Sequence, residues 1–172
     1  LLEVPKINWP DWARNTIRIN RKLSASAFVI AAPSDRGTAS VAILKPFYFE
    51  EDFLVETLPV RHGQVHPDTE LGITKLALID RYSGNAGISK MFWKSVGPKT
   101  LRSALACSVA HDLHNVWAIG NNDQAMAMAV NKRVEGGGGW VLVRDRQVVA
   151  IVRFEIGGLM SARPPVSYTH LT

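Results

Sequence analysis

Short apolar runs separated by turn-forming residues make up the first half of this sequence, which is typical of a protein built from β-strands. Pro59 places one of these strands at the edge of its sheet, because proline has no backbone N–H to donate to a neighbouring strand. Residues 27–32 and 39–45 are expected to pair around the turn at 33–37. We therefore expect strands at residues 16–19, 27–32, 39–45, 53–60 and 71–80.

The second half predicts one helix set between further strands. Strand-like apolar runs occupy residues 104–110 and 116–119, and a hairpin is expected at 140–154 with its turn at Asp145 and Arg146. Between them, residues at about 121–135 have helical spacing, with Asn121 as the expected N-terminal cap and four glycines after the last turn. The apolar face of this helix is expected to hold Met126, Ala129, Val130 and Val134, with Arg133 at its margin.

This order of elements predicts an α+β domain, consisting mostly of antiparallel or mixed β-sheet with at least one helix packed on it. A chain of 172 residues that is 47% hydrophobic is expected to form one domain, at residues 1–166. Residues 167–172 break with the preceding pattern and are interpreted as a non-native tail. Because the first residue is not Met and no signal peptide follows it, we expect a fragment of a longer chain.

Charge and cysteine content exclude several classes of function. The net charge of +5 is dispersed, without the basic stripe and interleaved aromatic residues of a nucleic-acid binder. No apolar run approaches the roughly 18 residues of a membrane span. The single Cys107 fits a reducing, cytoplasmic setting and is expected to be a small buried residue. His62 and His66 are interpreted as solvated loop residues, since Gly63 and Pro67 oppose a helix that would align them.

One polar cluster lies between two apolar runs, and it is the strongest candidate for a functional site. It contains His111, Asp112, His114 and Asn115. A carboxylate beside an imidazole can serve in acid/base chemistry, and a carboxamide can bind a carbonyl oxygen or a ring nitrogen. The two histidines alone are too few for a catalytic metal site, which usually takes three protein ligands. From spacing, a buried polar turn, an acid/base or substrate-gating role and metal binding all remain open.

Three motifs in order give the chain a family resemblance. Ser108, His111, Asp112, His114 and Asn115 match a Ser-x-x-His-Asp-x-His-Asn stretch, and Gly158, Leu159, Met160 and Ser161 match a closing Gly-Leu-Met-Ser. Between these two motifs, a helix-start motif is matched by Gly120, Asp123, Met126, Ala129, Val130 and Asn131. Over roughly residues 5–165 the chain resembles the C-terminal domain of the adenine deaminase family of metal-dependent amidohydrolases. Asp80-Arg81-Tyr82 stands where many members carry Glu-Arg-His, which indicates a divergent subgroup.

The resemblance implies a role in the hydrolysis of adenine to hypoxanthine and ammonia. It implies an upstream catalytic barrel in the same chain, which would use divalent manganese or iron, or zinc, and would bind a purine base. The family's His-x-His ligand motif does not occur in this sequence, so no metal ligands are expected here and the fragment alone is expected to be inactive. His111, Asp112, His114 and Asn115 would cover or support that active site in a cytoplasmic homo-oligomer.

A second hypothesis is a non-catalytic module for subunit contact or ligand binding. It is favoured by the incomplete catalytic set and by aromatic residues that can lie at interfaces. These residues are Trp9, Trp12, Phe92, Trp93 and Trp117.

Overall fold

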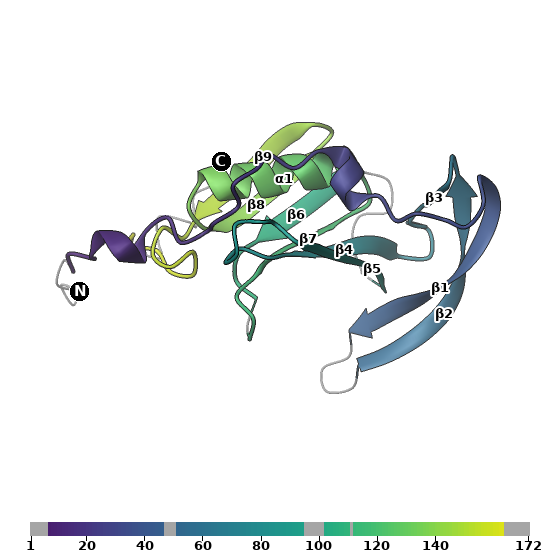
Figure 1. Ribbon diagram of the computed structural model, residues 1–172, viewed down its shortest axis with the longest axis horizontal. Helices are drawn as coiled ribbons and strands as arrows, with labels where there is room; N and C mark the ends of the chain where they lie inside the picture. The colour runs from purple at the N-terminus through teal and green to yellow at the C-terminus, as the bar shows by residue number, and fades with distance from the viewer. Residues whose placement is uncertain (1–6, 47–50, 95–101, 111, 164–172) are drawn as a thin grey trace.

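The computed structural model describes residues 7–46, 51–94, 102–110 and 112–163, which form one mixed β-sheet with a helix on one face (Figure 1). Within these ranges the strand order is β3-β2-β1-β5-β4-β7-β6-β8-β9. The strands are β1 (Arg36–Pro46), β2 (Glu51–Arg61), β3 (Gln64–Val65), β4 (Ile73–Ile79), β5 (Ile88–Lys94), β6 (Ser103–Cys107), β7 (Val116–Gly120), β8 (Gly139–Arg144) and β9 (Gln147–Arg153). The helices are α1 (Asp123–Glu135) and two short 3₁₀ turns, η1 (Asp11–Ala13) and η2 (Ala25–Phe28).

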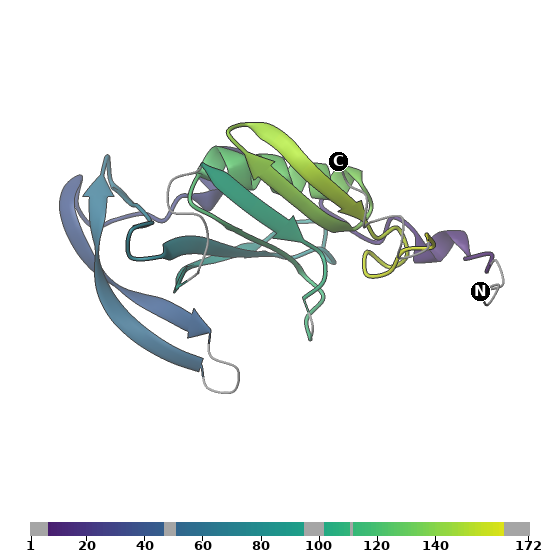
Figure 2. The same cartoon turned by 180° about the vertical axis from the view of Figure 1, so that it is seen from behind.

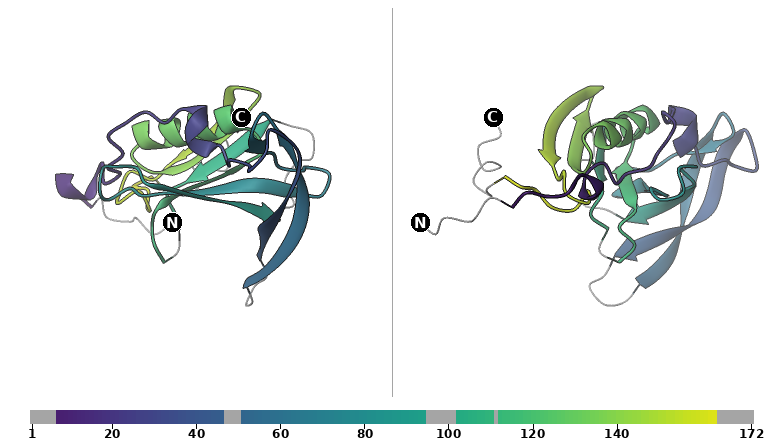
Figure 3. Two further views of the ribbon diagram at one scale, coloured as in Figure 1. Left: turned by 45° about the vertical axis from the view of Figure 1, so that its right-hand side comes forward. Right: turned by 60° about the vertical axis from the view of Figure 1, so that its left-hand side comes forward.

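The strand pairing is antiparallel except at one position. β1 and β5 run parallel through the pairs Ile43 with Phe92 and Leu44 with Trp93, so the sheet is mixed. The long β1–β2 ribbon bends away from the plane of the central strands (Figure 3). The predicted α+β class, with its single main helix and its C-terminal hairpin, is confirmed. None of the described helices is long and apolar enough to cross a membrane.

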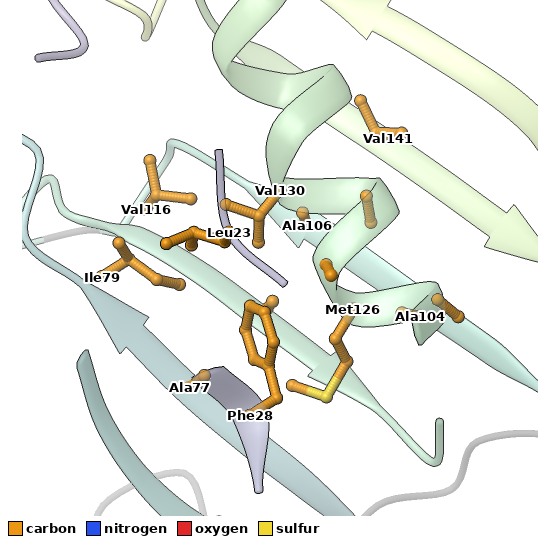
Figure 4. Packing of buried hydrophobic residues seen from close by; sticks show 14 of the residues in the cluster. Leu23, Phe28, Ala77, Ile79, Ala104, Ala106, Val116, Met126, Val130 and Val141 are labelled. Carbon is orange, nitrogen blue, oxygen red and sulfur yellow. The ribbon is translucent and has the colours of Figure 1, made fainter. Parts of the chain in front are cut away.

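The main core lies between α1 and the centre of the sheet (Figure 4). Met126 and Val130 project from the helix toward three alanines on neighbouring strands, Ala77, Ala106 and Ala118, each fully buried. Such small side chains allow the helix to pack close to the strands at the density of a protein interior. Leu23 and Phe28, from the N-terminal segment, fill the side of this core.

Three local predictions are wrong. Residues 16–19 contribute only an isolated bridge, Ile19 with Gly84. Residues 25–28 form the 3₁₀ turn η2, and β1 pairs with β2 and β5 instead of with residues 27–32. The helix is capped by Asn122, whose side chain accepts a hydrogen bond from the Ala125 N–H. Asn121 instead accepts one from the Ser103 N–H.

A buried ion pair joins the sheet to the helix. Lys75 of β4 is 3% exposed, and its Nζ lies 2.7 Å from an Asp123 carboxylate oxygen in the first turn of α1. The same Nζ donates to the Phe28 carbonyl at the end of η2, 3.3 Å away. One ammonium group therefore holds three elements together, and removing its partner would leave a buried cation without a counter-charge.

We predict that Asp123→Ala lowers the free energy of unfolding by about 3 kcal/mol, because Lys75 would stay buried and unpaired. Urea denaturation of the wild-type and variant proteins measures this loss. The matched control is Glu135→Ala, which removes the exposed pair between Lys132 and Glu135 at the other end of α1 and should leave stability nearly unchanged. Equal small effects of the two substitutions would contradict the structural role of Lys75.

Candidate functional site

The polar cluster singled out from the sequence lies in the loop of residues 108–115, between β6 and β7. This loop projects from the sheet on the side opposite α1 (Figure 1). At its tip Asp112 is exposed and the Leu113 side chain is 62% exposed, while His114 and Asn115 are half-buried. The prediction for His111 falls on a residue outside the described ranges. The cluster is thus presented on an exposed loop between two strands of the sheet.

Ser108 anchors the start of this loop. The Ser108 side chain is fully buried, and its hydroxyl donates to the Gly158 carbonyl. The same oxygen accepts hydrogen bonds from the Gly139 N–H at 2.9 Å and from Arg133 Nη2 at 3.4 Å. One side chain therefore ties the loop to the start of β8, to α1 and to the closing Gly-Leu-Met-Ser segment.

Further hydrogen bonds fix both sides of the loop. Trp117 Nε1 donates to the Val109 carbonyl at 2.8 Å, and the His114 N–H donates to the Ala110 carbonyl at 2.7 Å. The Tyr82 hydroxyl, from a neighbouring turn, donates to the Leu113 carbonyl at 3.1 Å. His114 takes a positive φ of 49°, a conformation that reverses the chain just before β7. The base of the loop is held in place while its tip stays accessible.

The turn that carries Tyr82 is shaped by Asp80. The Asp80 carboxylate accepts hydrogen bonds from the Ser83 hydroxyl and from the Tyr82 N–H. These two contacts, the Ser83 hydroxyl first, hold the pKa of Asp80 below its ordinary value. A charged Asp80 thus helps to position the tyrosine that contacts the loop.

Two buried arginines lie beneath the anchored end of the loop. Arg81 is 4% exposed and its Nη2 donates to the Gly157 carbonyl at 2.7 Å, while Arg133 is fully buried against Ser108. Burial lowers the pKa of Arg133 to about 10, so the group still carries its charge at neutral pH. Two nitrogens of each guanidinium group have no hydrogen-bond partner among the described residues.

Gly158 of the closing motif occupies a position that leaves no room for a side chain. Gly158 takes a φ of +74°, and a Cβ at this position would lie 2.8 Å from Arg81 Nη1. Any side chain would therefore push Arg81 away and disturb the carbonyl that accepts from Ser108. The close approach of Gly158 to Arg81 therefore requires glycine at the point where the closing segment accepts the hydrogen bond from Ser108.

The chemistry available at the loop is proton transfer and hydrogen bonding. Asp112, His114 and Asn115 lie within the same short loop segment, and the buried Asn115 Oδ1 accepts no hydrogen bond from any described residue. Among the residues that the structure describes, no three His, Cys, Asp or Glu side chains gather to hold a metal ion. The described part of this chain therefore does not fit a catalytic metal, and no metal-dependent step is assigned to it.

The burial of three further residues can be compared with the prediction from the sequence. Arg133, expected at the margin of the helix face, is completely buried. Its spacing from Met126 and Val130 placed it on the buried face, but its charge argued against that position. Cys107 is buried as predicted, and burial raises the pKa of its thiol. His62 lies in the exposed turn between β2 and β3, as expected for a solvated residue.

We predict that Ser108→Ala lowers the free energy of unfolding by about 2 kcal/mol, because the buried Gly139 N–H and Gly158 carbonyl lose their partner. The measurement is urea denaturation, with Ser89→Ala on an exposed position of β5 as the matched control. A Ser108 variant as stable as the control would show that the loop does not depend on this anchor.

Comparison with known proteins identifies the family to which this chain belongs. A family model described as the adenine deaminase C-terminal domain matches residues 50–169. Adenine deaminase 2 of Jannaschia sp. strain CCS1 is 52% identical over 165 residues, which is 96% of this chain and 26% of that protein.

Two further relatives match almost the whole chain. Adenine deaminase 1 of Bradyrhizobium sp. strain ORS 278 is 52% identical over 94% of this chain and 26% of its own length. The adenine deaminase of Moorella thermoacetica is 36% identical over 95% of this chain and 28% of its own length. The chain thus spans about a quarter of the curated relatives it matches, and it belongs to the adenine deaminase C-terminal domain family.

Proposed function

We propose that this chain is the C-terminal domain of an enzyme that hydrolyses adenine to hypoxanthine and ammonia. The observation that carries the proposal is the family match, together with relatives named adenine deaminase that are 52% identical over almost the whole chain. The anchored loop of residues 108–115 supports it, because that loop holds the family's polar motif on a rigid base.

The proposed role of the loop is to cover or support an active site formed by an upstream barrel. His111, Asp112, His114 and Asn115 would supply imidazole, carboxylate and carboxamide groups at the edge of that site. Such groups can transfer protons and bind the polar edge of a purine base. The rigid base matters here, because a loop that positions groups for catalysis must hold them within about 0.5 Å.

The parent enzyme is proposed to be a metal-dependent amidohydrolase of purine salvage. A divalent manganese or iron ion, or zinc, would make hydroxide available near neutral pH when bound by the upstream barrel. We further propose a homo-oligomer located in the cytoplasm. Among the described residues, no three His, Cys, Asp or Glu side chains gather to hold a metal ion. We propose that this domain is inactive by itself, because the family resemblance places the metal ligands in the upstream barrel.

We predict that His111→Ala or His114→Ala in the full-length chain lowers kcat/KM for adenine by about tenfold or more, because either change removes a group that can move a proton. Ammonia release measures the rate, and metal content and circular dichroism show that each variant is folded and loaded. The matched control is His62→Ala, which removes an exposed histidine from a turn of the β2–β3 connection. Unchanged kinetics in both loop variants would leave the cluster a structural turn.

A second prediction concerns the metal. Treatment of the full-length chain with a chelator should abolish ammonia release, and addition of manganese or iron should restore it, since the attacking hydroxide depends on the ion. This domain expressed alone should release no ammonia from adenine under the same conditions. Full activity after complete removal of divalent ions would contradict the proposed mechanism.

The non-catalytic alternative makes the opposite prediction for truncation. If a chain lacking residues 1–166 kept full activity but lost its oligomeric state, the domain would be a subunit-contact module. If the truncated chain lost activity while its metal stayed bound, the loop would be needed for the reaction itself.

A further inference from the structure

The two faces of the sheet have different coverings. Residues alternate between faces along each strand, and residues paired across strands share a face. The row of Ala77, Ala118, Ala106 and Val141 lies beneath α1. One residue further along the strands, the paired side chains point to the other face and are much larger.

This second surface, here called the open face, is apolar across most of the sheet. The register connects Met91 to Leu76, Ile119, Leu105 and Leu142 in one continuous row. A parallel row runs from Phe53 through Leu44 to Trp93. The apolar side chains of the open face include Leu44, Phe53, Val55, Leu76, Met91, Trp93, Leu105, Trp117, Ile119 and Leu142.

No helix of the described ranges covers this face. Seen from behind, β6, β8 and β9 lie in front of α1 with no helix over them (Figure 2). Val55 is 73% exposed and Phe53 is 60% exposed, and Leu142 and Met91 are 37% and 36% exposed. Monomeric proteins rarely leave so extended an apolar surface in water, so this face is expected to be covered in the complete protein.

The open face is continuous with the candidate site. Trp117 belongs to this face, and its Nε1 donates to the Val109 carbonyl of the loop. The loop and the β1–β2 ribbon both project on the side away from α1 (Figure 1). The ribbon forms one end of the open face, and the loop lies beside Trp117. Whatever covers the face must therefore lie beside residues 108–115.

We propose that the open face is the docking surface for the part of the chain that precedes this domain. The domain spans 26% of the length of its relatives and matches a C-terminal domain, so most of their length lies upstream of it. A partner on this face sits next to the loop, as the proposed function requires. The inference rests on the proposed function only for the existence of the upstream part.

The test is thiol alkylation of the full-length chain carrying Met91→Cys or Leu142→Cys, followed by mass spectrometry of the labelled peptides. The matched control is Val148→Cys, because Val148 is also 36% exposed but pairs with Val143 on the α1 side. We expect the two open-face thiols to react about tenfold or more slowly than the control thiol, at every protein concentration. The native Cys107, fully buried, reports unfolding if it becomes labelled.

Each outcome decides the proposal. Equal reaction rates at all three positions would overturn it, because the face would then be open to solvent. Protection that disappears on dilution would also overturn it and would assign the face to a second copy of the chain. Concentration-independent protection without adenine-dependent ammonia release would confirm the docking surface while contradicting the proposed reaction.

Discussion

A β-sheet with two apolar faces must bury both of them, and α1, the single α-helix among the described residues, can cover only one. The residues beneath α1 are alanines and valines that admit a closely packed helix, with the Lys75–Asp123 ion pair holding the helix start against β4. The opposite face carries leucine, isoleucine, phenylalanine and tryptophan side chains, and none of the described helices covers it. This asymmetry is the physical basis for our proposal that another part of the protein covers the open face.

The candidate site also differs between the two sides of the sheet. Its loop leaves the sheet on the uncovered side, while the hydrogen bonds that fix it run back through Ser108 to α1 and β8. The buried guanidinium groups of Arg81 and Arg133 each have two nitrogens without a hydrogen-bond partner among the described residues, at a cost to stability that the packing around them must offset. The loop base is therefore built from long-range contacts, and Asp112 at its tip is exposed.

Much of the fold could be predicted because its strongest elements are periodic. Residues 71–80, the helix and the C-terminal hairpin have clear alternation or helical spacing bounded by turn residues, and all three are present. The strand expected at residues 27–32 is wrong, because an apolar run does not distinguish a strand from a buried 3₁₀ turn. Phe28, in the turn η2, is buried in the core beneath α1. The loop was located correctly, but its anchor at Gly158 is 50 residues from Ser108, beyond any local pattern.

A crystal structure of the full-length chain with a bound purine would show whether this domain completes the active site. We expect the side chains of residues 111–115 to lie within hydrogen-bond distance of the purine or of residues that bind it. We also expect the upstream barrel to cover the open face beside them. If the loop instead faces solvent, away from the purine, the domain does not complete the active site.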